Sequence, residues 1–568
     1  MSVYLERPWR AVAPDVPARP GAVDQSTLGE VVDHWVRTTP RAPASHYFDG
    51  TTTWEQLDRE ADALAALLVA RGFGPGDRLA ICLQNDPAFL VGLVAAWRVG
   101  GVAAPLSPMM KADELEQLLL DYEPVALLAL DDVYRDVARP LLAGGHTAVR
   151  TVVTVSAHDG QSRHDPRVLG GERRMRPSDT VDLAGLVHDR DAFGPVRRHR
   201  ARPDDVAVVL PTSGTTGSPR GAKLTHANVL FSAGVYRDWG GLVEGEPVLA
   251  LSPVFHVTGL VAGVATAMLL GSPVVLTHRF EPGVVIDAVR ERRPTLAVAA
   301  ITAYIALSEH PDADREVLSP LRRTWSGGAP VRPETAERIA ERLGLDVLNV
   351  YGLTESTSPV TMVPPGVPAP VDAETGAGSV GLPVPRTDVR VVDEHGRDVP
   401  VRQIGELVVS GPQVISGYWN QGRPNAVSDA GHVFRSGDLG FMDEQGWFYV
   451  VDRSNDIINA SGFKIWPSEV ESVLAAHPDV REAAVVAIAD DYRGESAKAF
   501  VVLRTGALVT EGDLVEFCRE RLAAYKYPRE IELVAALPRT ATGKVMRSRL
   551  RQQGGRPLGT VSGSSSPG

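Results

Sequence analysis

The chain has 568 residues, 44% of them hydrophobic and 23% charged, which is an ordinary composition for a globular protein. Its length predicts two or more domains. A net charge of −12 at pH 7 argues against a nucleic-acid partner. The two cysteines, Cys82 and Cys518, are far apart in the sequence, so we expect no disulfide framework and no cysteine-based metal site.

Two stretches bear on the location of the protein. Residues 1–12 contain no apolar run of signal-peptide length. Residues 257–276 are apolar, but glycines and Pro273 interrupt them, and they are better divided into a buried helix, a turn and a strand. We therefore expect no membrane span and a cytoplasmic protein in a reducing compartment.

The first elements alternate between helix and strand. Leucine and alanine side chains at helical spacing predict a helix over residues 54–71, which Gly72 ends. Residues 78–83 are typical of a strand, and Pro87 begins a second helix that ends near Gly100. This alternation predicts an α/β fold, with a parallel sheet covered by helices on both faces.

Residues 151–202 interrupt the alternation. They are rich in arginine, aspartate, histidine and glycine and have little periodicity. We expect a long surface excursion that joins two halves of a large domain, although connections of this length are uncommon.

A loop rich in glycine and hydroxyl groups follows a predicted buried strand at residues 206–210 and precedes a predicted helix whose N-cap is Thr225. Its glycines can adopt positive φ, which lets successive backbone N–H groups converge on one anion. With its hydroxyls and two cations, the loop is expected to hold polyphosphate rather than to serve as a flexible linker. The residues are Thr212, Ser213, Gly214, Thr215, Thr216, Gly217, Arg220 and Lys223.

The spacing of this loop does not fit the P-loop, which needs Gly, four residues and then Gly-Lys-Ser/Thr. A kinase-like or GTPase-like protein is therefore disfavoured.

Further polar groups follow predicted strands. The strand at 247–253 leads to His256, for which a packed histidine and a ligand-facing one stay equally open. The strand at 347–351 ends in Tyr351, which could stack on adenine. Thr354 could bond phosphate, and Glu355 could hold Mg²⁺, which prefers carboxylate and phosphate oxygens.

The last third of the chain divides again. Short strands and polar turns predict a small β-rich region over about 389–451. Polar residues at 452–456 suit a hinge between domains. Beyond them, strands at 483–489 and 497–503 and a helix at 511–524 predict a small α+β domain, and the glycine- and serine-rich tail at 554–568 is expected to be disordered.

In order and in kind, these motifs resemble the adenylate-forming superfamily: acyl- and aryl-CoA synthetases, peptide-synthetase adenylation domains and firefly luciferase. The resemblance extends from about residue 54 to residue 549. Three positions depart from the usual pattern: Arg220 stands where members usually carry Lys, Ser436 where they carry Thr, and Asn455 where they carry Asp or Lys.

The resemblance implies a large N-terminal adenylation domain over 1–452, made of two parallel-type α/β subdomains and the β-rich subdomain. A hinge at 453–456 would connect it to a small, mobile α+β lid domain at 457–553.

The resemblance also implies roles for individual residues. Lys544, Glu355, Thr354 and His256 would be catalytic, with Glu355 holding Mg²⁺. Asn455 would be the swivel of the hinge, and Ser461, Gly462 and Phe463 would serve the thiol step. The segments 405–407 and 417–419 are expected to be mainly architectural. Besides the loop at 212–223 and Lys544, the nucleotide would contact Gly328, Ala329, Pro330, Asn349, Tyr351, Gly352, Asp438 and Arg453.

The activity that the resemblance implies is that of an ATP-dependent acid–thiol ligase. Such an enzyme forms acyl-AMP, releases pyrophosphate and transfers the acyl group to coenzyme A. Loading of a carrier protein and transfer to an amine stay open as alternatives, and so do a monomer and a homodimer. A nucleotide-binding module without catalysis is disfavoured because Lys544 and Glu355 are both present. The residues do not identify the acid.

Overall fold

The computed structural model describes most of the chain. The described residues are 3–13, 21, 23–169, 174–188, 193–212, 220–328, 331, 333–375, 377–420, 433–453, 456, 458–460, 463–490, 494–523, 526–540 and 543–554.

A seven-stranded sheet contains most of the early strands, in the order β7-β6-β5-β3-β4-β8-β9. All neighbours are parallel except β8 and β9, which form an antiparallel pair. The strands are β3 (Arg78–Cys82), β4 (Val102–Pro105), β5 (Ala126–Leu130), β6 (Thr151–Val155), β7 (Val181–Asp182), β8 (Val206–Pro211) and β9 (Gly221–Thr225).

A nine-stranded sheet lies beside it, in the order β16-β15-β14-β13-β12-β10-β11-β1-β2. The six strands from β14 to β1 run parallel, and the outer pairs are antiparallel. The strands are β1 (Pro43–Tyr47), β2 (Gly50–Thr53), β10 (Val248–Leu249), β11 (Val274–Leu276), β12 (Leu296–Ala299), β13 (Arg323–Gly327), β14 (Val347–Tyr351), β15 (Thr361–Met362) and β16 (Leu382–Pro383). The predicted strand at 247–253 is therefore much shorter than expected.

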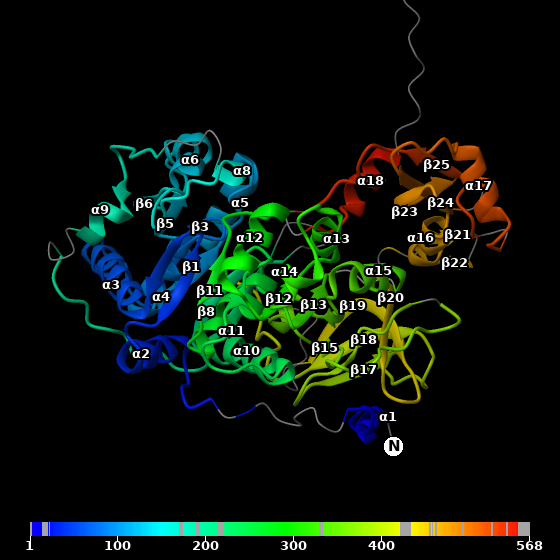
Figure 1. The fold of residues 1–568 in the computed structure, drawn as a ribbon, viewed down its shortest axis with the longest axis horizontal. Helices are drawn as coiled ribbons and strands as arrows, with labels where there is room; N and C mark the ends of the chain where they lie inside the picture. Colours follow the sequence, from blue (N-terminus) through cyan, green and yellow to red (C-terminus); the bar gives the residue numbers. More distant parts are fainter. Residues whose placement is uncertain are drawn as a thin grey trace, which may run out of the picture.

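Helices pack against both sheets (Figure 1). The predicted helix at 54–71 is α3 (Trp54–Ala70), which begins with a capping box between Thr53 and Gln56. Helix α4 (Pro87–Arg98) contacts β3 and β4 of one sheet and β1 of the other, and every residue after Pro87 is buried. The remaining long helices are α2 (Leu28–Thr38), α5 (Ala112–Tyr122), α10 (His226–Gly240), α12 (Pro282–Arg292), α13 (Ile301–Glu309) and α15 (Pro333–Leu343).

Two expectations need correction. Residues 151–202 are not simply a surface excursion, because β6 and β7 extend the seven-stranded sheet and helix α9 (Leu183–His188) packs on α3. The predicted phosphate-binding loop does not connect a strand to a helix. It connects β8 to β9, and α10 begins only after β9, with Thr225 as the predicted N-cap. The loop is thus the tip of a hairpin, fixed at both ends by strand pairing.

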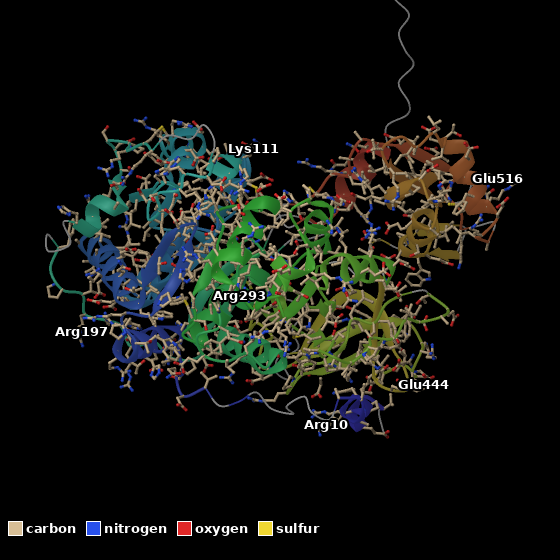
Figure 2. All side chains as sticks on the ribbon, in the orientation of Figure 1. Arg10, Lys111, Arg197, Arg293, Glu444 and Glu516 are labelled. Atoms are coloured by element: carbon tan, nitrogen blue, oxygen red, sulfur yellow. The ribbon has the colours of Figure 1, made fainter. Side chains whose placement is uncertain are left out.

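The apolar stretch at 257–276 divides as expected, into the π-helix η4 (Gly259–Ala265), helix α11 (Thr266–Leu269) and β11. None of the helices among the described residues combines the length and the apolar character that crossing a membrane requires. Exposed charged side chains, such as Lys111, Arg197 and Glu516, lie around the outside of the molecule (Figure 2).

The β-rich region is a four-stranded antiparallel sheet of β17 (Asp388–Val392), β18 (Gly405–Ser410), β19 (Val433–Met442) and β20 (Phe448–Arg453). The C-terminal elements form a separate lobe with its own apolar core (Figure 1). They are β21 (Ile458–Ala460), β22 (Phe463–Ile465), α16 (Pro467–Ala475), β23 (Val480–Asp490), β24 (Gly494–Leu503), α17 (Glu511–Arg519), β25 (Glu530–Leu533) and α18 (Arg547–Gly554).

Candidate active site

The hairpin of β8 and β9 presents the predicted phosphate loop. Its tip, with Ser213, Gly214, Thr215, Thr216 and Gly217, lies outside the described residues. At its base, the Thr212 N–H donates to the Arg220 carbonyl at 2.8 Å. The Thr212 hydroxyl is buried and makes no hydrogen bond within the described part of the chain. A buried hydroxyl without a partner is costly, so the base of the hairpin suits a phosphate oxygen.

Strand β14 ends at the predicted nucleotide site. The Tyr351 hydroxyl donates to Asp438 Oδ2 at 2.7 Å, and Asp438 is buried on β19. The structure therefore brings together the residues predicted for adenine and ribose. Asn349 lies on the same strand, and its side chain joins two loops to it: Oδ1 accepts from the Val331 N–H at 3.1 Å, and Nδ2 donates to the Ser379 carbonyl at 3.0 Å.

The residues after β14 hold the predicted metal ligand. A side chain at Gly352 would overlap the carbonyl of Ser358, so only glycine fits there. Thr354 and Glu355 follow in the short 3-10 helix η5 (Thr354–Ser356), and both are 8% exposed. A carboxylate this deeply buried needs hydrogen bonds or a positive partner.

Tyr418 supplies one hydrogen bond to that carboxylate. Its hydroxyl donates to Glu355 Oε1 at 2.8 Å. Burial, and then the negative charge of Glu355, raise the pKa of Tyr418 well above its ordinary value, so the hydroxyl stays protonated. The second oxygen of Glu355 remains suited to Mg²⁺, which binds through carboxylates and phosphate oxygens. These residues fit the predicted metal.

Lys544 comes to the site from the C-terminal lobe. Its Cε lies 2.9 Å from the place that a Cβ at Gly328 would occupy, and Gly328 has φ +90°. The preceding residue, Gly543, packs on Thr302, where a Cβ would lie 3.0 Å from Oγ1. Glycine at both positions thus permits a close approach between the lysine loop and the large domain.

His256 lies near this lysine. Burial, and then the charge of Lys544, lower the pKa of His256 to about 3. Its Nδ1 faces the N–H of Thr258 at 3.4 Å. The imidazole is therefore neutral at physiological pH.

Several predicted residues lie outside what the structure describes. They are Ala329, Pro330, Asn455, Ser461 and Gly462. The backbone of Arg453 ends β20 and pairs with Asp438, and Phe463 begins β22, but their side chains are not described. Lys223 donates its backbone N–H to Gly417 at 3.1 Å, at the base of the hairpin.

The site contains one contact that sequence reasoning missed. Tyr418 belongs to the segment 417–419, which we expected to be mainly architectural, yet its side chain contacts Glu355 directly. The Arg220 guanidinium lies over the same ring, 4.1 Å from its centroid. No spacing rule connects these three residues, so no local pattern could have shown the contact.

This chain is similar to known proteins over almost its whole length. The family model described as AMP-binding enzyme matches residues 32–419, and the model described as AMP-binding enzyme C-terminal domain matches residues 469–544. A feruloyl-CoA synthase of Amycolatopsis sp is 34% identical over 91% of this chain and 97% of its own length. A long-chain-fatty-acid–CoA ligase of Bacillus subtilis is 32% identical over 96% of this chain and 98% of its own.

Among solved structures, ATP-bound MatB from Rhodopseudomonas palustris superposes with a TM-score of 0.79, and apo MatB with 0.68. In both cases the identity is 28%, and the alignment covers 93% of this chain and 98% of the other. The chain belongs to the AMP-binding enzyme family. The predicted superfamily, the fold class and the enzyme class, an AMP-forming acyl-CoA synthetase that uses ATP and coenzyme A, are confirmed.

Proposed function

We propose that this protein activates a carboxylic acid as acyl-AMP between its large domain and the Lys544 loop, and then transfers the acyl group to coenzyme A. The observation that carries the proposal is the position of Lys544, which lies against Gly328 and close enough to His256 to lower its pKa. A cation from the C-terminal lobe is thus brought to the residues predicted to bind nucleotide.

In the first step, an oxygen of the acid attacks the α-phosphorus of ATP, and pyrophosphate leaves. Negative charge gathers at phosphorus, so catalysis depends mainly on positioning and on fixed positive groups. Lys544 would hydrogen-bond to the acyl and α-phosphate oxygens. Removing one such donor typically costs about 3–4 kcal/mol at the barrier. Mg²⁺ held by Glu355 would neutralise charge on the phosphates.

The remaining residues orient the nucleotide in this proposal. The ring of Tyr351 would stack on adenine, and its hydroxyl fixes the carboxylate of Asp438 for the two ribose hydroxyls. The Thr212 hydroxyl and the hairpin would bind the leaving pyrophosphate. His256, neutral and at the end of a buried apolar segment, would border the acid without adding charge.

The second step requires Lys544 to leave. We propose that the C-terminal domain, residues 457–553, rotates about the hinge at 453–456 and brings Ser461, Gly462 and Phe463 to the thiol. The higher TM-score with ATP-bound MatB than with apo MatB, at equal identity and coverage, supports an adenylation arrangement for the present structure.

We further propose an acid with a sizeable apolar body, either aliphatic or aromatic. One relative named above is a long-chain-fatty-acid–CoA ligase and the other is a feruloyl-CoA synthase. In addition, the π-helix η4 beside His256 is fully buried and apolar. A panel of acids, scored by pyrophosphate release, distinguishes the two. A cytoplasmic role in fatty-acid metabolism belongs to the same proposal.

The central experiment separates the two steps. Lys544→Ala is expected to lower ATP–pyrophosphate exchange by about 100- to 1,000-fold. Thioester formation from chemically prepared acyl-AMP should be unchanged. Lys111→Ala, at an exposed lysine of the large domain (Figure 2), is the matched control. Exchange that survives in Lys544→Ala, or an equal loss in both steps, would contradict the assignment.

A further inference from the structure

We propose that Tyr418 is a positioning residue that aligns Glu355 for its metal and couples that alignment to the phosphate hairpin. The inference deepens the proposed function and rests on it in one respect, the role of Glu355 as metal ligand. Its basis is a set of contacts that link the buried residues Glu355 and Tyr418 to Arg220, which is half-buried.

The first contact fixes the carboxylate. Tyr418 is fully buried and donates from its hydroxyl to Glu355 Oε1. An ionised carboxylate only accepts hydrogen bonds, so the phenol must be the donor. Because hydrogen bonds to charged groups are about twice as strong as neutral ones, this bond selects one orientation of Glu355 and leaves Oε2 for another partner.

The backbone around Tyr418 connects the base of the phosphate hairpin to the backbone of Glu355. Residues 417–419 lie along β9: the Lys223 N–H donates to the Gly417 carbonyl at 3.1 Å, and the Trp419 N–H donates to the Gly221 carbonyl at 2.6 Å. A few residues earlier, the Ile415 N–H donates to the carbonyl of Glu355 at 2.9 Å. One short segment therefore holds both the base of the hairpin and the backbone of the metal ligand.

Arg220 adds the third contact. It is the first described residue after the loop tip, and its guanidinium carbon lies over the Tyr418 ring, 4.1 Å from the ring centroid. A planar guanidinium stacks on an aromatic face in a way that an ammonium does not. The arginine that departs from the usual lysine thus has a specific partner. A movement of the hairpin would be transmitted through this ring to the hydroxyl that holds Glu355.

The test measures metal binding without turnover. In the full-length enzyme with ATP and no acid, Mn²⁺ is titrated and the free ion is followed by electron paramagnetic resonance. Tyr418→Phe keeps the ring under Arg220 and removes only the hydroxyl. We expect it to weaken Mn²⁺ binding by about tenfold. Arg220→Lys keeps the charge and loses the stacking, and about threefold is expected.

Two further measurements separate positioning from general damage. ATP binding in EDTA, followed by calorimetry, should be the same in Tyr418→Phe and in the wild type. The thermal midpoint should fall by only a few degrees, because one hydrogen bond to a buried carboxylate is lost while the ring stays packed. Tyr449→Phe is the matched control, because the Tyr449 hydroxyl donates to Asp443 Oδ2 at 3.1 Å in a buried contact away from the site. It should leave Mn²⁺ binding unaltered.

Glu355→Gln distinguishes the possible failures. If it weakens Mn²⁺ binding and Tyr418→Phe does not, the positioning role is overturned and the proposed function stands. If Glu355→Gln leaves Mn²⁺ binding intact, the proposed metal ligand is wrong, and the inference falls with it. Parallel losses of Mn²⁺ binding and of metal-free ATP binding in Tyr418→Phe, with a thermal midpoint lowered by much more than a few degrees, would show a structural role only and would also overturn the inference.

Discussion

Asp452 Oδ2 accepts a hydrogen bond from the backbone N–H of Ser468 at 3.1 Å, across the segment predicted to be the hinge. Ser468 lies in the first turn of α16, whose own N-cap residue, Trp466, makes no side-chain cap. A carboxylate at a helix N-terminus satisfies an unpaired N–H and interacts favourably with the helix dipole. A residue that precedes the hinge therefore caps a helix that follows it.

This cap predicts that its removal lowers the rate of adenylation more than the rate of thioester formation. Asp452→Ala should weaken the present arrangement by about 1 kcal/mol and lower pyrophosphate exchange by roughly fivefold. Thioester formation from acyl-AMP should not fall, because this bond would break in the proposed rotation of the lobe. Thr510→Ala removes a cap of α17 that lies wholly within the lobe, and it should lower stability without changing the ratio of the two steps. The same ratio in both variants would rule out a cap specific to one arrangement.

A second prediction concerns Tyr351 and Asp438. Tyr351→Phe keeps a ring for stacking but removes the donor to Asp438, so the KM for ATP should rise by about three- to tenfold with little change in kcat. The ratio of kcat/KM for ATP to kcat/KM for 3′-deoxy-ATP should be smaller in this variant than in the wild type, because the Asp438 carboxylate would no longer be held in position for the ribose hydroxyls. Steady-state kinetics with both nucleotides measure this coupling. The same ratio in the variant and in the wild type would show that the position of the Asp438 carboxylate does not depend on the Tyr351 hydroxyl.

A third prediction follows from the lowered pKa of His256. The unfolded chain protonates this imidazole below its ordinary pKa of about 6.5, whereas the folded chain does so only near 3. The group therefore costs stability as pH falls through that window. In a nuclear magnetic resonance titration, the resonance that is missing in His256→Gln should not shift between pH 8 and pH 5. In Lys544→Ala it should titrate at a somewhat higher pH, since one of the two causes is removed. A titration midpoint near pH 6.5 for His256 in the wild type would show that burial does not lower its pKa.

The fourth prediction uses the buried N-cap of α4. Burial is the main cause that raises the pKa of Asp86 to about 7, and Asp159 and Glu60 add to it. Because the ionised form is disfavoured in the fold, stability is lost as pH rises from the ordinary value towards 7. Asp86→Asn keeps a good cap and carries no charge. Its advantage over the wild type in urea unfolding should widen between pH 5 and pH 8, and a constant difference would refute the shift.

Local signals account for most of what the sequence predicted correctly. Thr225 begins α10 as predicted, because a hydroxyl at that position bonds a backbone N–H only a few residues away. Thr53, which was not predicted as a cap, begins α3 in the same way. The strand that ends at Tyr351 was equally visible, since a short apolar run met a turn. Such signals depend on neighbours in the chain, and a single sequence contains them.

The errors involve partners that are distant in the chain. Nothing in residues 221–225 shows that they pair with β8, so the hairpin was predicted as a strand followed by a helix. Residues 151–155 are apolar enough for a strand, but the polar residues that follow them favoured the prediction of a surface excursion. For the same reason, Tyr418 was not predicted to contact the metal ligand, and Asp452 was predicted only as part of the hinge segment. Each makes a side-chain hydrogen bond to a residue in another element.

The place of β1 has a consequence for how this chain is made. Ser45 of β1 pairs with Val274 of β11, whereas β3, β4 and β5, which come between them in the sequence, build the other sheet. As the polypeptide emerges from the ribosome, its first strand has no parallel neighbour until β11 has been synthesised. The early segment must wait, with its edge unpaired, while the seven-stranded sheet assembles, and an amino-terminal fragment that ends before β11 would keep that edge open to pairing with other chains.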